Sequence, residues 1–399
     1  MYSGTQGDGA TDIQPTRDGG YIFIGETTSN DGDVSNNHGN GDIWVVKLNK
    51  NGSIAWQSCY GGSSVEYSSG YTYGKGDIRE TPDGYVFLGS TKSTDGQVTG
   101  MHKNPNPNLD WADIWAVKLN TTGTIVWQQC IGGIGNEEPS GLAITSDGGC
   151  LIAGNTSSLD GNVPAKHGAV GTDPFLMKLQ ANGTIQWSKA YGGSGDDGCS
   201  ELAPTFDGGA IVAGTTSSSD GDVSFLHGTL SDAWVFKVNS TGALEWEKTF
   251  GGSRPEVFTH VLVKNEDELL LTGYTQSADG DGDVRGGRNA GAPASYSEVW
   301  ILKTGNYNII KGTVFIDYNA NGIKDGNDVF MKKGIVTSTK PGYQTAGAVF
   351  DGKFILGVDT GTYTTSFQSS YYTKHNSIIV MAVIYNSLFD KCQSLSNYY

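Results

Sequence analysis

One sequence pattern recurs through residues 1–305 of this chain. A double glycine marks each clear copy, at Gly61, Gly132, Gly192 and Gly251, and these copies lie 71, 60 and 59 residues apart. Repetition at such a period is typical of arrays in which each unit covers the apolar face of its neighbour. The pattern therefore restricts this part of the chain to stacked or circular units.

Each repeat contains four segments with the composition of β-strands. In the first copy they lie at residues 10–16, 21–25 and 43–48 and in the stretch that ends at Trp56. The segment Tyr21–Gly25 is apolar on both faces, which is typical of a strand that is covered on both sides. An Asp-Gly turn joins the first two segments, as in a tight hairpin. Four antiparallel strands per unit predict the blade of a β-propeller.

The fold expected from these segments is all-β, with an about five-bladed propeller of four-stranded blades at residues 1–305, whose first and last repeats are incomplete. A small β-sandwich is expected at 306–375, followed by an atypical tail at 376–399. A solenoid is the main alternative. It is disfavoured because its units usually carry two or three strands in roughly 20–45 residues.

Composition excludes several classes of partner. The formal net charge is −16, so the phosphate backbones of nucleic acids and anionic membranes are unfavourable partners. No apolar run approaches the ~20 residues that a spanning helix needs, so we expect no membrane insertion. We also expect a monomer. Cys59 and Cys130 occupy one repeat position that is Ala190 and Thr249 in other copies, which predicts buried free thiols.

A carboxylate follows the double glycine in every copy. The five positions are Asp8, Glu66, Glu137, Asp197 and Glu256. One interpretation places them in a ring at the mouth of the central channel, where they would repel each other and raise one another's pKa. The other interpretation, which we favour, is that each one accepts hydrogen bonds from nearby glycine-rich backbone amides.

Two further polar marks recur. Asp31 precedes His38 by seven residues, and the same spacing joins Asp95 to His102, Asp160 to His167 and Asp220 to His227. Asp and His could bind a metal ion, but a turn stabilised by aspartate side chains is favoured.

A lysine in the third strand, Lys47 in the first copy, follows an acid such as Asp42. This arrangement predicts an ion pair within the blade.

The second repeat contains an insertion, residues 99–111, that the other copies lack. Trp111 has no counterpart elsewhere, and His102 lies in the same insertion. An aromatic residue on a long loop of a rigid scaffold is a candidate ligand contact, so both residues are candidate binding residues. The alternative is that Trp111 packs its own loop against the domain.

A different chemical signal follows the repeats. The stretch from Asp317 to Asp328 fits the calcium loop Asp-x-Asn-x-Asn-Gly, with Asp in place of the usual terminal Glu. The expected ligands are Asp317, Asn319, Asn321, Ile323, Asp325 and Asp328. Oxygen atoms at alternate positions can surround one Ca²⁺ ion, whereas the alternative is an Asx-rich turn without an ion.

Three resemblances add to this interpretation. The Gly-x-x-x-Trp ending, Gly52 to Trp56, resembles the tryptophan-docking element of quinoprotein-like propellers, which implies an indole packed on the next blade's backbone. The repeats, with Asp-Gly-Gly-Tyr-Ile and Tyr-Gly-Gly-Ser, resemble those of secreted Bacteroidetes proteins of the type IX secretion pathway. Residues 311–328 resemble the calcium-binding Cna-B-like domains of bacterial surface adhesins. These resemblances imply a signal peptide and a sorting domain, neither of which is in this sequence. We expect a fragment, with a cytoplasmic protein as the alternative, because the first repeat lacks the tryptophan-bearing strand that precedes every other double glycine.

The function expected is that of a secreted or cell-surface binding and adhesion module without catalysis, with Ca²⁺ stabilising its C-terminal domain and a glycan or surface protein as partner. A glycan-active hydrolase on the propeller face is the second hypothesis, and a passive spacer is the third. An enzyme predicts unique carboxylates that share a pocket. A binder predicts an aromatic groove near Trp111, and a spacer predicts neither.

Overall fold

The computed structural model describes residues 1–303 except 68–75, 107, 110, 170, 266–267 and 285–296, together with the strands between residues 308 and 394. All the secondary-structure elements in the described residues are β-strands. The chain divides into two compact units, of which Met1–Glu266 with Leu270–Leu302 is the first.

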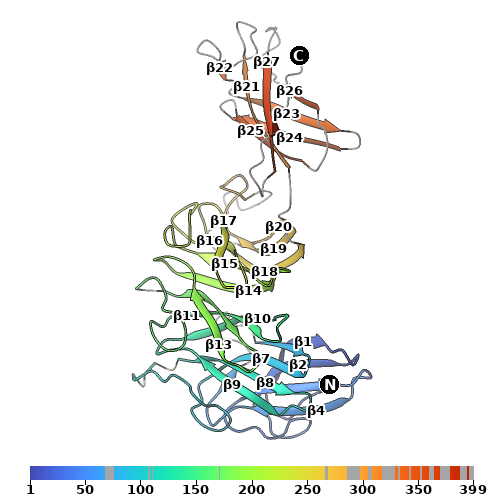
Figure 1. Cartoon of the computed structure of the whole chain (residues 1–399), viewed down its shortest axis with the longest axis vertical. Coiled ribbons are helices and arrows are strands. Elements are labelled where there is room, and N and C mark those ends of the chain that lie inside the picture. The colour runs from blue at the N-terminus through green and yellow to red at the C-terminus, as the bar shows by residue number, and fades with distance from the viewer. Residues whose placement is uncertain are drawn as a thin grey trace. The chain divides into compact units, whose positions relative to one another are not determined.

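The first unit contains five antiparallel sheets (Figure 1). The first sheet comprises β1 (Asp8–Pro15), β2 (Tyr21–Thr27), β3 (Asp42–Leu48) and β4 (Ile54–Tyr60). The second comprises β5 (Glu66–Tyr67), β6 (Asp77–Thr81), β7 (Gly84–Thr91), β8 (Asp113–Asn120) and β9 (Ile125–Ile131). The third comprises β10 (Glu137–Ile144), β11 (Cys150–Thr156), β12 (Asp173–Leu179) and β13 (Ile185–Ala190). The fourth comprises β14 (Asp197–Pro204), β15 (Ala210–Thr216), β16 (Asp232–Val238) and β17 (Leu244–Phe250). The fifth comprises β18 (Glu256–Asn265), β19 (Glu268–Thr275) and β20 (Glu298–Lys303).

The strands of each sheet pair in chain order, except that β5 and β6 of the second sheet both pair with β7 and together take the place of a first strand. The leading strands of successive sheets meet. Strand β1 contacts β6, β6 contacts β10, β10 contacts β14 and β14 contacts β18. Sheets whose first strands follow one another in this way are arranged radially, as the blades of a propeller are. The predicted fold class, an all-β propeller of four-stranded antiparallel blades, is confirmed. The number of blades stays a prediction.

The apolar core lies between neighbouring sheets. Ile24 and Val45 of the first sheet form one buried cluster with Phe87 and Trp115 of the second. All seven residues of β3 are buried, including the strand's polar positions. A strand that is covered on both faces carries apolar residues at successive positions, which explains the absence of an alternating pattern in Tyr21–Gly25.

Tryptophans join each of the first three sheets to the sheet that follows it, as their sequence position predicts. The Nε1 of Trp56 donates a hydrogen bond of 3.0 Å to the carbonyl oxygen of Thr121. The indole lies over Gly123, where an added Cβ would come within 3.0 Å of the ring. The same pair of contacts joins Trp127 to Ala181 and Gly183, and Trp187 to Ser240 and Gly242.

The predicted ion pair between the third-strand lysine and the preceding acid is wrong. Lys47 Nζ lies 2.8 Å from Asp18 Oδ2, in the Asp-Gly turn, and not beside Asp42. Residues 42 and 47 stand at opposite ends of β3, and five residues of strand span roughly 16 Å. The turn between β1 and β2 lies at the lysine's end of the sheet. The corresponding pairs are Lys118–Asp83, Lys178–Asp147, Lys237–Asp207 and Lys303–Glu268.

The second unit, Lys303–Tyr399 with Asp267–Leu269, contains one hydrogen-bonded sheet of eight strands. They are β21 (Asn308–Ile316), β22 (Val329–Phe330), β23 (Lys333–Lys340), β24 (Tyr343–Phe350), β25 (Lys353–Val358), β26 (Thr364–Gln368), β27 (Ile378–Asn386) and β28 (Gln393–Ser394). Strands β26 and β27 are far apart in the sheet order but contact each other, so the sheet folds back on itself.

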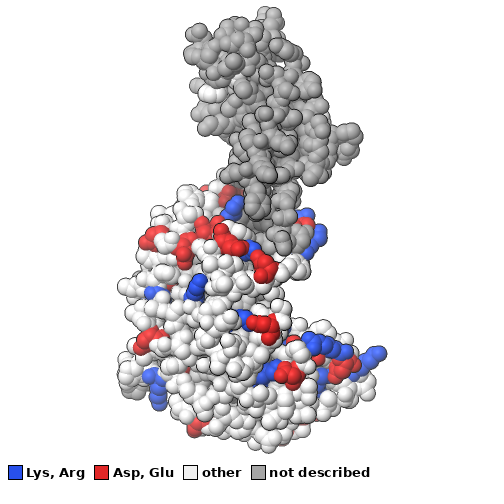
Figure 2. All heavy atoms as spheres, viewed as in Figure 1, with Lys and Arg blue, Asp and Glu red and all other residues white. Residues whose placement is uncertain are grey.

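Two further sequence predictions bear on the described residues. Cys59 and Cys130 are free and buried, as are Cys150 and Cys199. Among the described residues, no helix has the length and apolar character of a membrane span. On the face seen in Figure 2, acidic and basic side chains lie in mixed groups between broad uncharged areas.

Candidate functional site

The repeated carboxylates lie inside the structure and accept hydrogen bonds. Glu66 is 1% exposed, and its Oε2 accepts a bond of 2.9 Å from the backbone N–H of Gly62. Its Oε1 accepts one of 2.8 Å from the hydroxyl of Thr91. Glu137, Asp197 and Glu256 are also buried and accept the same kinds of bonds, and the half-buried Asp8 accepts them from Gly4 and Thr27. These contacts are the ones that the hydrogen-bonding interpretation expects, and a ring of the five acids around a central channel stays a prediction.

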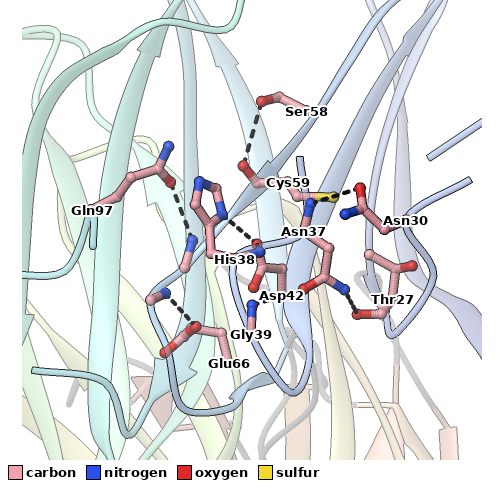
Figure 3. A network of polar contacts seen from close by, with 12 residues as sticks. Thr27, Asn30, Asn37, His38, Gly39, Asp42, Ser58, Cys59, Glu66 and Gln97 are labelled. Carbon is pink, nitrogen blue, oxygen red and sulfur yellow. Dashed lines mark hydrogen bonds and ion pairs between the residues drawn. The ribbon is translucent and has the colours of Figure 1, made fainter. Parts of the chain in front are cut away.

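The histidines of the repeated loops pair with the acid that begins the third strand. His38 Nδ1 lies 2.6 Å from Asp42 Oδ2, which also accepts the backbone N–H of His38 (Figure 3). The equivalent pairs are His102–Asp113, His167–Asp173 and His227–Asp232. His102 is therefore one of four equivalent positions that tie a loop to its sheet. Within the described part of the chain, no group of three His, Cys, Asp or Glu side chains could hold a metal ion.

A second carboxyl lies beside each of these aspartates. A Cβ added to Gly61 would clash with Glu66 Oε2 and lie 2.8 Å from Asp42 Oδ1, so both oxygens face one glycine. Asp42 Oδ1 is buried and has no hydrogen-bond partner among the described residues. Burial raises the pKa of both carboxyls, and for Glu66 the neighbouring Asp42 adds to the increase. The arrangement recurs at Asp113 and Glu137 beside Gly132, and at Asp232 and Glu256 beside Gly251.

The aspartates of the repeated Asp-Gly loops hold the glycine loop that begins their own sheet. Asp95 accepts bonds of 2.7 Å from both the N–H and the hydroxyl of Ser63. These bonds lower the pKa of the Asp95 carboxyl. Asp31, Asp160, Asp220 and Asp281 make corresponding bonds. This repeated mark is therefore a structural turn, which is the favoured interpretation from the sequence.

The residues on either side of the repeated carboxylate do not repeat. The position before it is Gly7, Val65, Asn136, Asp196 or Pro255 in successive copies. The position after it is Gly9, Tyr67, Glu138, Gly198 or Val257. Repeated residues maintain the fold of an array, whereas side chains that belong to one unit alone are free to serve a ligand.

Several of these unrepeated residues line a depression beside the insertion. It has a volume of about 350 Å³, and Tyr67, Lys92, Leu109, Trp111 and Glu138 are among the residues that surround it. Lys92 Nζ lies 5.7 Å from the centre of the Tyr67 ring. Trp111, the ligand contact suggested by the sequence, therefore lies in the wall of a depression together with a second aromatic residue.

A larger cavity adjoins this depression. It has a volume of about 550 Å³, and Glu138, Asn155, Asp196 and Tyr274 are among its lining residues. Asn136 and Glu138 line both spaces, so the two adjoin at these side chains. We call the combined space the mouth groove and define it by Tyr67, Trp111, Asn136, Glu138, Asp196 and Tyr274. The larger cavity lies at the beginnings of β10, β14 and β18, the first strands of their sheets.

Hydrogen bonds position the polar side chains of the mouth groove. Asn136 Nδ2 donates to Glu138 Oε1 at 3.2 Å, and Asn136 Oδ1 accepts the N–H of Ala112 at 3.1 Å. Asp196 Oδ1 accepts the N–H and the hydroxyl of Thr172 at 2.7 and 2.9 Å. Oriented amide and carboxylate oxygens beside aromatic rings suit a ligand that combines hydroxyl groups with apolar C–H faces.

Glu138, Asp196 and Tyr274 were not predicted from the sequence, where the residues that repeat stand out. The repeated residues form hydrogen bonds within and between sheets. A signal was nevertheless present, because the two positions that flank the repeated carboxylate vary while the carboxylate itself does not. The predicted calcium ligands at 317–328 lie outside the described residues.

Comparison with known proteins gives remote likenesses. No family model and no curated protein matches the chain. The chain is similar to the WD40 domain of Neurospora crassa Pan2, at 10% identity over 88% of this chain and 90% of that one, with a TM-score of 0.36. It is similar to BamB from Moraxella catarrhalis, at 16% over 63% and 66%, with a TM-score of 0.29. It is also similar to an endo-arabinase from Bacteroides thetaiotaomicron, at 12% over 74% and 92%, with a TM-score of 0.31. Because these scores are low, the description of the fold rests on the chain's own strand pairing.

Proposed function

We propose that this chain is a non-catalytic binding module that acts as a monomer and holds a neutral glycan in the mouth groove. The observation that supports it is that the repeated and the unrepeated polar and aromatic residues have different roles. The repeated ones are engaged in hydrogen bonds and ion pairs of the fold, including Glu137, Asp197 and Glu256, which also border the mouth groove. The unrepeated Tyr67, Trp111, Glu138 and Asp196 line its two adjoining spaces and have side chains that belong to one repeat alone. The net charge of −16 disfavours anionic ligands.

Aromatic rings and hydrogen-bond acceptors would divide the recognition between them. Trp111 and Tyr274 would pack against the C–H faces of sugar rings, while Asn136 and Glu138 would accept hydrogen bonds from hydroxyl groups. Recognition of this kind needs no movement of the sheets, because the groove is built on the ends of packed strands.

Glycan-array screening followed by calorimetry tests this proposal. The wild-type chain is expected to bind at least one neutral glycan, and Trp111→Ala is expected to weaken that binding about tenfold or more. Phe206→Ala is the matched control, because Phe206 is an exposed aromatic residue on a turn outside the groove. The proposal would be contradicted if the wild type and Trp111→Ala bound the glycan with equal affinity. It would also be contradicted if Trp111→Ala and Phe206→Ala lost the same amount of affinity.

A glycan-active hydrolase is the second candidate, and one observation favours it. Glu138 and Asp196 are unrepeated carboxyl residues that line the same cavity, and glycoside hydrolysis generally uses a pair of carboxyl groups. Under this hypothesis Glu138→Gln would abolish sugar release and retain binding. Under the binding hypothesis, neither the wild type nor the variant releases sugar.

Secretion and calcium binding are separate parts of the proposal. The likeness of the repeats to secreted Bacteroidetes proteins supports an extracellular or surface location. The oxygen-rich sequence from Asp317 to Asp328 supports a Ca²⁺ ion that stabilises the C-terminal unit. Saturating Ca²⁺ is expected to raise the melting temperature of the wild type, and Asp317→Ala is expected to remove that increase. An unchanged melting temperature of the wild type would remove the calcium site from the proposal.

A further inference from the structure

One residue near the end of each second strand differs in every repeat. It stands between a glycine and a threonine that all five copies share, and in successive sheets it is Glu26, Ser90, Asn155, Thr215 or Tyr274. A Cβ added at Gly89 would clash with Ile43 of the preceding sheet. Because side chains alternate between the two faces of a strand, the side chain of Ser90 faces the sheet that follows.

In the third and fourth sheets this variable residue is hydrogen-bonded to the next sheet. Asn155 Oδ1 accepts the N–H of Cys199 at 2.7 Å, and Asn155 Nδ2 donates to the carbonyl oxygen of Cys199 at 3.0 Å. The hydroxyl of Thr215 lies 3.1 Å from the carbonyl oxygen of Glu256 on the fifth sheet. These contacts close the two junctions between sheets at the level of the variable residue.

The junction between the second and third sheets is built differently. Ser90 is 3% exposed, and its Oγ has no hydrogen-bond partner among the described residues. Pro139 stands two residues after the repeated carboxylate, where the next sheet has Cys199, and a proline has no N–H to donate. The depression of about 350 Å³ in the mouth groove has Ser90 in its wall. The side-chain contacts that Asn155 makes at the following junction are therefore replaced here by a space and an unpaired hydroxyl.

The residues around this hydroxyl favour one kind of ligand group. Glu137, Glu138 and Lys92 line the same depression. An anionic group would face the two glutamates, and an ammonium group would face the lysine, whereas a hydroxyl is neutral and can both donate to Ser90 and accept from it. Because Ser90 is almost fully covered, the group must also be slender. A hydroxymethyl group carries its hydroxyl one carbon beyond the sugar ring, so it reaches further than a hydroxyl on the ring itself.

We propose that Ser90 forms the base of a subsite that takes the hydroxymethyl group of a hexose unit and thereby selects hexoses over pentoses. This inference rests on the proposed binding of a neutral glycan in the mouth groove and adds which sugars the groove prefers. The ligand hydroxyl would bond to Ser90 Oγ while the sugar ring lies against Trp111, which lines the same depression. A pentose such as xylose has no hydroxymethyl group and would leave the buried Ser90 hydroxyl unpaired.

Calorimetry with the full chain tests the subsite. The probes are short oligosaccharides of glucose, mannose and galactose, together with xylose oligosaccharides, which differ from those of glucose in lacking the hydroxymethyl group. At least one hexose oligosaccharide is expected to bind the wild type roughly tenfold more tightly than the xylose oligosaccharide does. Ser90→Ala is expected to weaken hexose binding by a similar factor and to leave xylose binding unchanged.

The outcomes separate this inference from the proposed function. Equal affinity of the wild type and Ser90→Ala for the hexose oligosaccharide would overturn the subsite, as would equal affinity of the wild type for hexose and xylose oligosaccharides. If that binding were still lost in Trp111→Ala, glycan binding in the mouth groove would stand without the subsite. Absence of binding to every probe would overturn the subsite.

Thermal unfolding of the unliganded chain distinguishes a ligand-binding serine from a structural one, and Ser140→Ala is the matched control. Ser140 is as buried as Ser90, but its hydroxyl donates to the carbonyl oxygen of Cys199 at 2.8 Å. We expect Ser140→Ala to lower the melting temperature and to keep hexose affinity. Ser90→Ala is expected to keep the melting temperature, because it removes a hydroxyl that has no partner in the fold. Equal decreases in the melting temperatures of the two variants would show that Ser90 stabilises the fold and would overturn the proposal.

Discussion

The indole Nε1 of Trp56 and the carbonyl oxygen of Thr121 lie 3.0 Å apart although 65 residues separate them in the chain. The first residue belongs to β4 and the second to the turn after β8, so the bond joins two successive sheets. The same bond recurs from Trp127 to Ala181 and from Trp187 to Ser240. Each sheet of this series is thus fastened at its outer strand to the sheet that follows.

Removing one of these fasteners is expected to destabilise the first unit. We expect Trp127→Ala to lower the free energy of unfolding by about 2 kcal/mol, because it removes one hydrogen bond and a half-buried ring. Trp127→Phe keeps a ring and is expected to lose about 1 kcal/mol. Urea denaturation followed by circular dichroism measures both. If the urea midpoint of Trp127→Ala equals that of the wild type, the hydrogen bonds of the indoles are not stabilising.

The paired carboxyls predict a strict need for glycine at the double-glycine mark. In Gly132→Ala the new Cβ would lie 2.6 Å from Glu137 Oε2 and closer still to Asp113 Oδ1, both of which are buried. Crowding of this kind costs about 1–3 kcal/mol. Gly9→Ala is the matched control, since a Cβ there meets nothing within 4 Å. Thermal unfolding of the two variants is compared, and equal melting temperatures would contradict the assigned clash.

The carboxyl pairs also predict how stability depends on pH. Burial raises the pKa of Asp113, and burial followed by the adjacent Asp113 raises that of Glu137. The folded state then holds a proton that the unfolded chain releases. Their contribution to stability is therefore complete below the ordinary carboxyl pKa of about 4 and decreases as pH rises through the folded-state values.

Asp113→Asn tests this pH dependence, because its amide carries no charge and can donate a hydrogen bond to Glu137. We expect this variant to lose less stability than the wild type as pH rises above about 4. Asp147→Asn is the control, because the contribution of Asp147 to stability depends on pH in the opposite direction. The bond from Lys178 lowers the pKa of Asp147 to about 2 from an ordinary 3.8, so its contribution is present above pH 3.8 and is lost as pH falls. Identical stability–pH profiles for the wild type and Asp113→Asn would refute the carboxyl pair.

Thiol reactivity offers an independent test of the core. Burial raises the pKa of Cys59, Cys150 and Cys199 to about 12, so their thiolates are scarce at pH 8. Burial also raises the pKa of the Cys130 thiol. In folded Cys392→Ser we expect no reaction with a thiol reagent within minutes, and four reactive thiols after denaturation. Rapid labelling of the folded variant would contradict the burial of these residues.

The structural repeats could be predicted from the sequence, because the same local sequence signals recur in every unit of an array. The Asp-Gly turn, the apolar second strand and the Gly-x-x-x-Trp ending each predict short-range structure, and the structure contains them at the expected places. The roles of Lys47 and Asp42 could not be predicted in the same way. Both residues lie in β3, and which partner each one meets depends on the hydrogen-bonded register with β2 and on the loop that returns over the sheet.

The mouth groove could be predicted only in part from the sequence. Trp111 stood out in the sequence because it interrupts a repeat, whereas Glu138, Asp196 and Tyr274 come from three different sheets. Strand period, turn chemistry and the tryptophan at the end of each unit are local properties, and the sequence by itself determined them. Only the tertiary structure decided which unrepeated side chains share a cavity. Those relationships depend on the radial packing of whole sheets, and no spacing along the chain records the distance between residues that lie on different blades.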